Sequence, residues 1–305
     1  MSQPLVLAGS RGPAQILIPA DRQVQYPRFS PDGRHLAVTI TDAQSTDVWI
    51  LDLPSGPLRR LTAEGGLNDR PEWTPDSRMV LFRSNRSGGG TALGRTFALW
   101  TQAADGSRPA QPFFEVEGAG VYEGVISRDG SHLLFQLDST GTGGRTWYRS
   151  LRGDTTLHVV AAARAGQQTA ARFSPDGRWV AYESDELGSS QVYVKPFPAL
   201  DARYQVSLEL GNQPVWSRDG TRLYYLDGSL LLSASLAFSP AFTVTSRDTV
   251  LAGGVEPGFG YHANYDVSPD GRAFAYVRSG AEGAPIIVVH DWKYELRARA
   301  REAER

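Results

Sequence analysis

The chain has 305 residues, of which 31 are Lys or Arg and 33 are Asp or Glu, so its formal net charge is −2 at pH 7. This near-neutral balance excludes a globally basic nucleic-acid-binding protein and gives no reason to expect contact with an anionic membrane surface. Cysteine is absent, which excludes disulfides, thiolate catalysis and zinc–cysteine sites. With 41% hydrophobic and 21% charged residues, the composition is that of a folded protein.

The N-terminal residues, Met1 to Gly9, carry no basic segment and no long apolar run, so they do not resemble a signal peptide. No stretch approaches the roughly 20 consecutive apolar residues of a transmembrane helix. We therefore expect a soluble chain with no direct membrane insertion, cytoplasmic if it is made as written.

A short motif recurs along the whole chain: an apolar residue, Ser or Thr, often Pro, then Asp-Gly and usually Arg. Its six copies are 43 to 53 residues apart, and their aspartates are Asp32, Asp76, Asp129, Asp176, Asp219 and Asp270. The second copy has Ser77 in place of glycine, and the third and fifth have Arg128 and Arg218 in place of proline. Asp-Gly between two apolar runs predicts a hairpin, because glycine readily adopts the positive φ of the turn.

Strand-like runs surround each copy of the motif. A second run follows the turn at residues 36–38, 79–82, 133–135, 179–182, 223–225 and 274–276. A third run follows at residues 47–51, 98–100, 146–148, 191–194, 230–232 and 286–289. Weaker fourth runs precede the next copy. Four short antiparallel strands repeated every 40–50 residues describe the blade of a β-propeller, so six units predict six blades.

The two ends of the chain are expected to close the ring. Two further runs, 5–7 and 16–18, precede the first motif, and we expect them to complete the blade begun by residues 262–291. Closure removes the open sheet edges that a linear array would leave. The predicted fold is all-β: residues 1–291 form one six-bladed propeller, and residues 292–305 form a short, charged helical tail.

Several stretches carry a family resemblance that covers almost the whole chain. The stretches are 26–33, 47–50, 60–62, 178–184, 192–198 and 287–296. They resemble the TolB-like, WD40-like propellers of bacteria, and in particular those C-terminal to the kinase and membrane segments of bacterial Ser/Thr protein kinases. No kinase signature is present, so the resemblance implies no kinase activity. It implies a binding or sensing module, extracytoplasmic if the chain is a segment of a membrane-anchored kinase or receptor.

The repeated aspartates are interpreted as turn residues, because one copy per blade scatters the carboxylates around a ring and an Asp at a turn accepts backbone N–H bonds. Differences between the repeats are more informative. Four residues before each Asp, the last blade has Asp266, the first Arg28 and the second Glu72, which predicts an ion chain between neighbouring blades. Six residues before each Asp the side chains are mixed and mostly polar, at the expected start of each innermost strand.

We therefore predict a non-catalytic binding or sensing module with its site at one mouth of the channel. The predicted ligand-binding residues are Tyr26, Arg70, Glu123, Gln213, His262 and Asn264. We expect a protein or peptide partner, or a small polar ligand, and a monomer. No catalytic residue, metal ligand or cofactor is assigned, and no nucleic-acid partner is expected.

Two alternatives stay open. One is a metal-dependent propeller enzyme of the lyase or lactonase type with its site in the channel, which needs several His, Asp or Glu side chains around an open ion position. Among the residues six positions before each motif Asp, only Glu123 carries a carboxylate, which counts against the metal-dependent enzyme. The other is a scaffold that binds through its loop faces and is indifferent to changes at the channel mouth.

Overall fold

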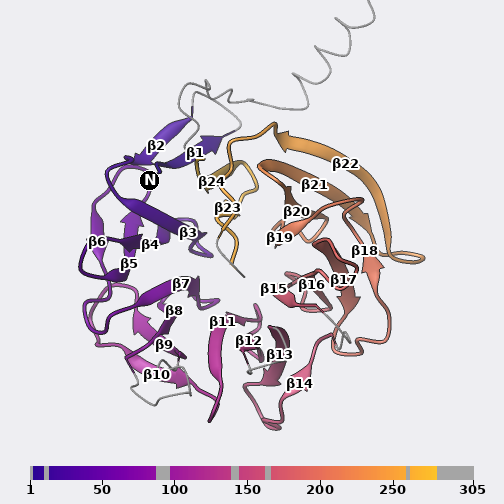
Figure 1. Ribbon diagram of the computed structural model, residues 1–305, viewed down its shortest axis with the longest axis horizontal. Helices are drawn as coiled ribbons and strands as arrows, with labels where there is room; N and C mark the ends of the chain where they lie inside the picture. Colours follow the sequence, from indigo (N-terminus) through magenta and orange to yellow (C-terminus); the bar gives the residue numbers. More distant parts are fainter. Residues whose placement is uncertain are drawn as a thin grey trace, which may run out of the picture.

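The computed structural model describes residues 3–9, 14–86, 97–138, 144–161, 166–258 and 262–279. Six four-stranded antiparallel sheets radiate around a central axis as the blades of a propeller, which confirms the predicted fold class (Figure 1). The described residues contain strands and no helix. The expected helical tail, residues 292–305, lies outside the described residues.

The first five blades each use four consecutive strands. Blade 1 has β3 (Gln23–Phe29), β4 (His35–Thr41), β5 (Thr46–Asp52) and β6 (Leu58–Arg60). Blade 2 has β7 (Asn68–Trp73), β8 (Met79–Ser84), β9 (Ala98–Ala103) and β10 (Gln111–Phe114). Blade 3 has β11 (Gly120–Ile126), β12 (His132–Asp138), β13 (Arg145–Ser150) and β14 (His158–Val159). Blade 4 has β15 (Gln168–Phe173), β16 (Trp179–Ser184), β17 (Gln191–Pro196) and β18 (Tyr204–Gln205). Blade 5 has β19 (Asn212–Trp216), β20 (Arg222–Asp227), β21 (Leu230–Ala237) and β22 (Thr243–Leu251).

Blade 6 joins the two ends of the chain. Its inner strands are β23 (Tyr265–Val267) and β24 (Ala273–Val277), and its outer strands are β1 (Leu5–Gly9) and β2 (Gln15–Ile18). β1 pairs antiparallel with β24, with Leu5 opposite Val277. The prediction that the N-terminal strands complete this blade is confirmed. The third place in the sheet is taken by β1, however, and not by the run 286–289, which lies outside the described residues.

The apolar core is divided among the interfaces between blades. Six clusters of buried side chains occur in the described residues, and each joins two neighbouring blades. The cluster between blades 6 and 1 packs Leu5 and Val277 against Val24 and Leu36. Since no blade buries both its faces alone, the six interfaces depend on one another and on the closure of the ring.

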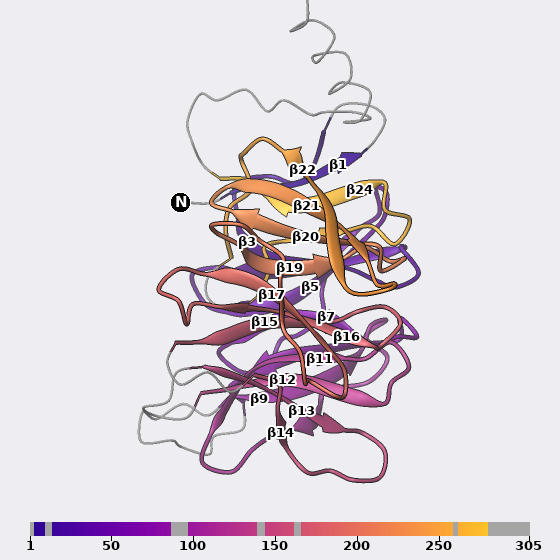
Figure 2. The same ribbon diagram turned by 90° about the vertical axis from the view of Figure 1, so that its right-hand side faces the viewer.

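The strands run roughly from one face of the ring to the other (Figure 2). The innermost strands are β3, β7, β11, β15, β19 and β23. Each ends at its Asp-Gly motif, and all six motifs surround one opening of the central channel. We call this side of the ring the turn face.

Candidate functional site

The six motif aspartates form the turns, as predicted. Ser30 Oγ donates to Asp32 Oδ1 at 2.6 Å, and the backbone N–H of Arg34 donates to the same oxygen at 3.1 Å. The same hydroxyl–carboxylate bond, 2.5 to 2.6 Å long, recurs in the five other motifs. Hydroxyl and N–H donors from Ser127 and Ser131 lower the pKa of Asp129 to about 2. In all six motifs the Asp Oδ1 atom is thus used by its own turn.

Five of the innermost strands, β3, β7, β11, β15 and β19, have a β-bulge near the position six residues before the motif Asp. In four blades this residue has a left-handed backbone, with φ of 57° at Tyr26, 54° at Arg70, 50° at Ala170 and 55° at Gln213. The register between the first two strands shifts there. A bulge redirects the side chain and interrupts the sheet ladder, so the local N–H needs another acceptor.

Side chains accept three of these bulge N–H groups. Tyr26 N donates to Asn264 Oδ1 of blade 6 at 2.8 Å. Arg70 N donates to Thr39 Oγ1 at 3.2 Å, and Gln213 N donates to Glu183 Oε2 at 3.1 Å. In each case the acceptor comes from the preceding blade. The bulges therefore join neighbouring blades close to the axis.

Five charged or titratable side chains from five blades meet on the axis, and we call them the axial cluster. They are Arg28, Glu72, Glu123, Arg172 and His262. Arg172 donates from Nη1 to Glu123 Oε1 at 2.8 Å and lies with Nη2 2.9 Å from Glu72 Oε1. Arg28 Nε donates to the same Glu72 oxygen at 2.8 Å. The two carboxylates are thus held by two guanidinium groups.

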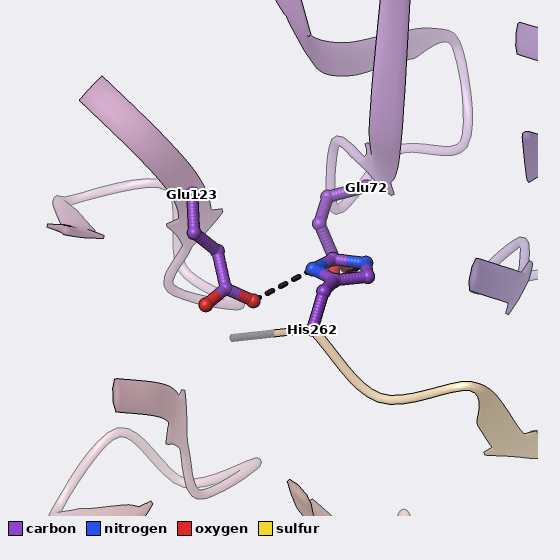
Figure 3. Close-up of side chains that lie close together, drawn as sticks. All are labelled: Glu72, Glu123 and His262. Atoms are coloured by element: carbon purple, nitrogen blue, oxygen red, sulfur yellow. Dashed lines mark hydrogen bonds and ion pairs between the residues drawn. The ribbon is translucent and has the colours of Figure 1, made fainter. Parts of the chain in front are cut away.

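His262 lies between the two carboxylates (Figure 3). Its Nδ1 lies 2.7 Å from Glu123 Oε1, and its Nε2 lies 3.5 Å from Glu72 Oε1. Burial lowers the pKa of His262 well below its usual value, and the positive charges of Arg28 and Arg172 lower it further. The lowered pKa favours a neutral imidazole, whose Nδ1 is hydrogen-bonded to Glu123 Oε1. Burial raises the pKa of Glu123, against the opposing pull of Arg172.

The predicted ion chain between blades is confirmed in part. Arg28 and Glu72 form the expected pair, but the network continues across the axis to Arg172 and Glu123. Asp266 instead accepts the backbone N–H of Phe29 at 2.8 Å. Burial raises the pKa of Asp266 to about 6.

Glu72, Glu123 and His262 are the one group in the described residues with the composition and spacing to hold a metal ion, their ligand atoms lying within 4.8 Å of one another. The residues present do not fit an ion, because the carboxylate oxygens that would bind it already contact Arg28 and Arg172. A cation at this point would meet the charge repulsion of both guanidinium groups.

The six residues predicted to bind a ligand come together around this cluster. The ring of Tyr26 lies edge-on to His262, with centroids 5.2 Å apart. Arg70 donates to the carbonyl oxygen of Tyr122 at 2.9 Å. Gln213 Oε1 accepts from the N–H groups of Asn264 and Gly258 at 3.1 and 3.2 Å.

The expectation of an open rim at this position is wrong. Tyr26, Arg70, Glu123, Gln213, His262 and Asn264 are between 0% and 9% exposed, and none lines the large cavity described below. The bulges turn these side chains towards one another, so they fill the axis of the ring. Whether any of them contacts a ligand stays a prediction.

The channel opens on the turn face as a cavity of about 380 Å³. The polar side chains at its base stand four residues before a motif Asp: Arg28, Glu72, Arg172 and Asp266. Its walls are largely apolar. They include the residues three positions before each motif Asp: Phe29, Trp73, Ile126, Phe173, Trp216 and Val267. Its rim consists of the residues just before each motif Asp: Pro31, Pro75, Arg128, Pro175, Arg218 and Pro269.

The indole N–H groups of the two wall tryptophans are already used. Trp73 Nε1 donates to the carbonyl oxygen of Arg28 at 2.9 Å, and Trp216 Nε1 donates to that of Arg172 at 3.1 Å. With the N–H fixed by the neighbouring blade, each tryptophan offers the cavity an apolar surface. A concave pocket that combines apolar side chains with a few fixed polar groups is the usual form of a ligand site. Alignment of the six motifs could have revealed this cavity. The residues four, three and one positions before each Asp form its base, walls and rim, in that order.

The model of the TolB beta propeller domain family matches residues 15–142. An uncharacterized protein of Agrobacterium fabrum, Atu1656, is 34% identical over 79 residues, which is 26% of this chain and 25% of that protein. The matched part spans a quarter or less of the length of the first curated relatives. No helix in the described residues is long and apolar enough to cross a membrane.

Solved structures share the fold at low sequence identity. A protein described as a TolB from Agrobacterium tumefaciens is 15% identical, with a TM-score of 0.69 over 91% of this chain and 98% of that chain. The oligogalacturonate lyase of Vibrio parahaemolyticus is 12% identical, with a TM-score of 0.56 over 93% of this chain and 99% of that chain. Fold, motif repeats and family match together define the class, a six-bladed β-propeller. Within that class, residues 15–142 are similar to the TolB beta propeller domain, and the fold is similar to that of the Agrobacterium tumefaciens protein.

Proposed function

We propose that this propeller is a non-catalytic binding module whose ligand enters the cavity on the turn face. One observation supports this most: the cavity has apolar walls above a polar base, and Glu72 at that base is held in ion pairs with Arg28 and Arg172. A volume of about 380 Å³ lies within the range of small-molecule sites and would admit a few residues of a peptide.

The buried residues behind the base have a supporting role in this proposal. Glu123, His262 and their neighbours fix the positions of Arg172 and Arg28 through hydrogen bonds and ion pairs. Their rigidity keeps the cavity open in the free protein, which reduces the entropy cost of binding. We propose a protein partner that offers a short segment to the cavity, or a small polar ligand of similar size.

The absence of cysteine makes a direct test possible. Pro269→Cys places a single thiol on the rim, and Ala43→Cys places one on an exposed loop, between β4 and β5, that does not line the cavity. We would select binders from a random heptapeptide display library and measure alkylation of each thiol with and without them. Binders that protect the rim thiol but not the loop thiol are expected. Binders that protect neither thiol, or both equally, would reject the cavity as the site.

A metal-dependent lyase or lactonase is the second candidate. Its support is the Glu72–Glu123–His262 group and the fold shared with an oligogalacturonate lyase. The two arginines that hold these carboxylates weigh against it. A metal titration, described in the Discussion, separates the two functions.

A further inference from the structure

Two turn motifs depart from the others at the rim of the cavity. Four motifs have proline just before the Asp, whereas blades 3 and 5 have Arg128 and Arg218. Arg218 Nη1 donates to the carbonyl oxygen of Pro31 at 3.0 Å, so this side chain reaches from blade 5 to blade 1. Arg128 also lines a neighbouring hollow with turn residues of blades 5 and 6, so its side chain reaches across the mouth.

The charges of these two arginines are not neutralised by the described residues. Burial and the positive charge of Arg128 lower the pKa of Arg218. Neither arginine belongs to an ion pair within the described ranges. Asp219 and Asp270 line the neighbouring hollow with Arg128, and the Oδ1 atom of each accepts a serine hydroxyl and a backbone N–H of its own turn. The mouth therefore carries two guanidinium groups beside largely apolar walls.

A third donor lies at the base of the cavity. Arg28 is 4% exposed, and its Nη2 is buried without a hydrogen-bond partner in the described residues. Its Nη1 donates to the carbonyl oxygens of Pro27, Ala263 and Tyr265, and its Nε donates to Glu72. An unsatisfied buried N–H is costly, so an acceptor from a ligand would be favourable here. Glu72 and Asp266 lie at the same level, which disfavours an anion and favours a neutral oxygen.

We infer that the cavity selects an acidic peptide segment with apolar neighbours. Its carboxylate binds between Arg128 and Arg218 at the mouth, its apolar side chain packs on Trp73 and Trp216, and a backbone carbonyl oxygen reaches Arg28 Nη2. Guanidinium groups bind carboxylates through paired, charge-assisted hydrogen bonds, which lysine or proline cannot reproduce. This inference rests on the proposed function and adds the chemical class of the ligand.

The test uses the heptapeptide library on the full chain and on the double variant Arg128→Pro/Arg218→Pro. Proline occupies this position in four of the six motifs, so the turns of the variant should be retained. The wild type is expected to enrich peptides with Asp or Glu next to apolar residues, and the variant to lose that enrichment. For the best peptide, replacing its acidic residue by the amide should weaken binding at least about tenfold in the wild type and less than about twofold in the variant.

Three controls make each outcome decisive. Arg178→Ala removes an exposed arginine that does not line the cavity and should leave binding unchanged. Arg128→Gln/Arg218→Gln repeats the test if the proline variant melts early. Competition by 3-phenylpropionate, compared with its neutral amide, separates a free small acid from a peptide as the ligand. If that acid and the peptide compete with equal potency, the proposal of a peptide ligand is overturned.

The result separates the two proposals. Neutral peptides that protect the rim thiol of Pro269→Cys would overturn the acidic ligand and leave the binding function intact. If no peptide protects that thiol, both proposals are overturned.

Discussion

Glu123 Oε1 lies 2.7 Å from His262 Nδ1, although the two residues are 139 positions apart in the sequence. Glu123 lies on β11 of blade 3, and His262 precedes β23 of blade 6. These blades face each other across the ring (Figure 1). The contact therefore crosses the channel axis, and it exists only when the ring is closed. The axial cluster links closure of the ring to the base of the cavity on the turn face.

Removing Glu123 tests the energetic role of this cluster. Glu123→Ala leaves Arg172 buried with one carboxylate partner, Glu72, and removes the carboxylate partner of His262 Nδ1. Breaking a buried pair costs about 3–5 kcal/mol, and we expect a loss of that order in urea unfolding at neutral pH.

The exposed Glu209→Ala serves as the control and should change stability by less than about 0.5 kcal/mol. Adding Arg172→Met to Glu123→Ala should cost less than the sum of the single changes, since both remove one interaction. A loss below about 1 kcal/mol for Glu123→Ala would show that the cluster contributes little to the fold.

Asp266 predicts a specific pH dependence. Burial raises the pKa of Asp266 to about 6, so the folded chain holds this proton more tightly than the unfolded chain. The carboxyl therefore stabilises the fold most below about pH 4 and loses that contribution as the pH rises through about 6. Asp266→Asn lacks the titration. We expect the variant to gain stability relative to the wild type between about pH 4 and 7, by an amount of order 3 kcal/mol.

The measurement is the difference in unfolding free energy between the two proteins across that range. His262 and Glu123 titrate in both proteins, so their contributions largely cancel in the difference. Asp129→Asn is the opposite control: hydroxyl donors lower the pKa of Asp129, so the wild type should lose stability relative to that variant as the pH falls towards about 2. A difference for Asp266→Asn that is independent of pH would contradict the raised pKa.

The repeats predicted the architecture because the information for it is local. Each Asp-Gly turn needs only a nearby hydroxyl and a few backbone groups, so six copies were enough to place six hairpins. The N-terminal strands could be assigned to the last blade because an open edge would otherwise remain.

The site was harder to predict, because burial on the axis depends on side chains from distant blades. Alignment of the repeats shows which residues share a level of the channel, but not how far each side chain reaches across it. Arg172 has the same motif position as Arg28, yet it contacts Glu123, which stands two positions earlier in the motif of the neighbouring blade. The cavity could not be predicted, because the apolar side chains of its walls, such as Trp73 and Trp216, cannot be told from packing between blades by sequence alone.

A metal titration tests the competing enzyme function. Because Arg28 and Arg172 already contact Glu72 and Glu123, we expect Mn²⁺, Zn²⁺ or Ca²⁺ at about millimolar concentration to leave the unfolding midpoint unchanged. Thermal unfolding with each ion, with and without chelator, measures this. A midpoint that rises with one metal, falls again with chelator and no longer responds in His262→Ala would favour the lyase or lactonase function.

Closure of the ring by the N-terminal strand can be tested with a matched pair of substitutions. Val6 lies on β1, is 0% exposed and packs in the cluster between blades 5 and 6, whereas Ile16 on β2 is 55% exposed. Val6→Ala removes buried methyl groups and should cost about 2 kcal/mol, while Ile16→Ala should cost less than about 0.5 kcal/mol. Urea unfolding should stay a single transition in both variants, because the interfaces between blades form one closed ring. Equal, small losses for the two variants would show that β1 does not bear on the closure of the ring. A separate early transition in Val6→Ala would show that blade 6 unfolds independently of the others.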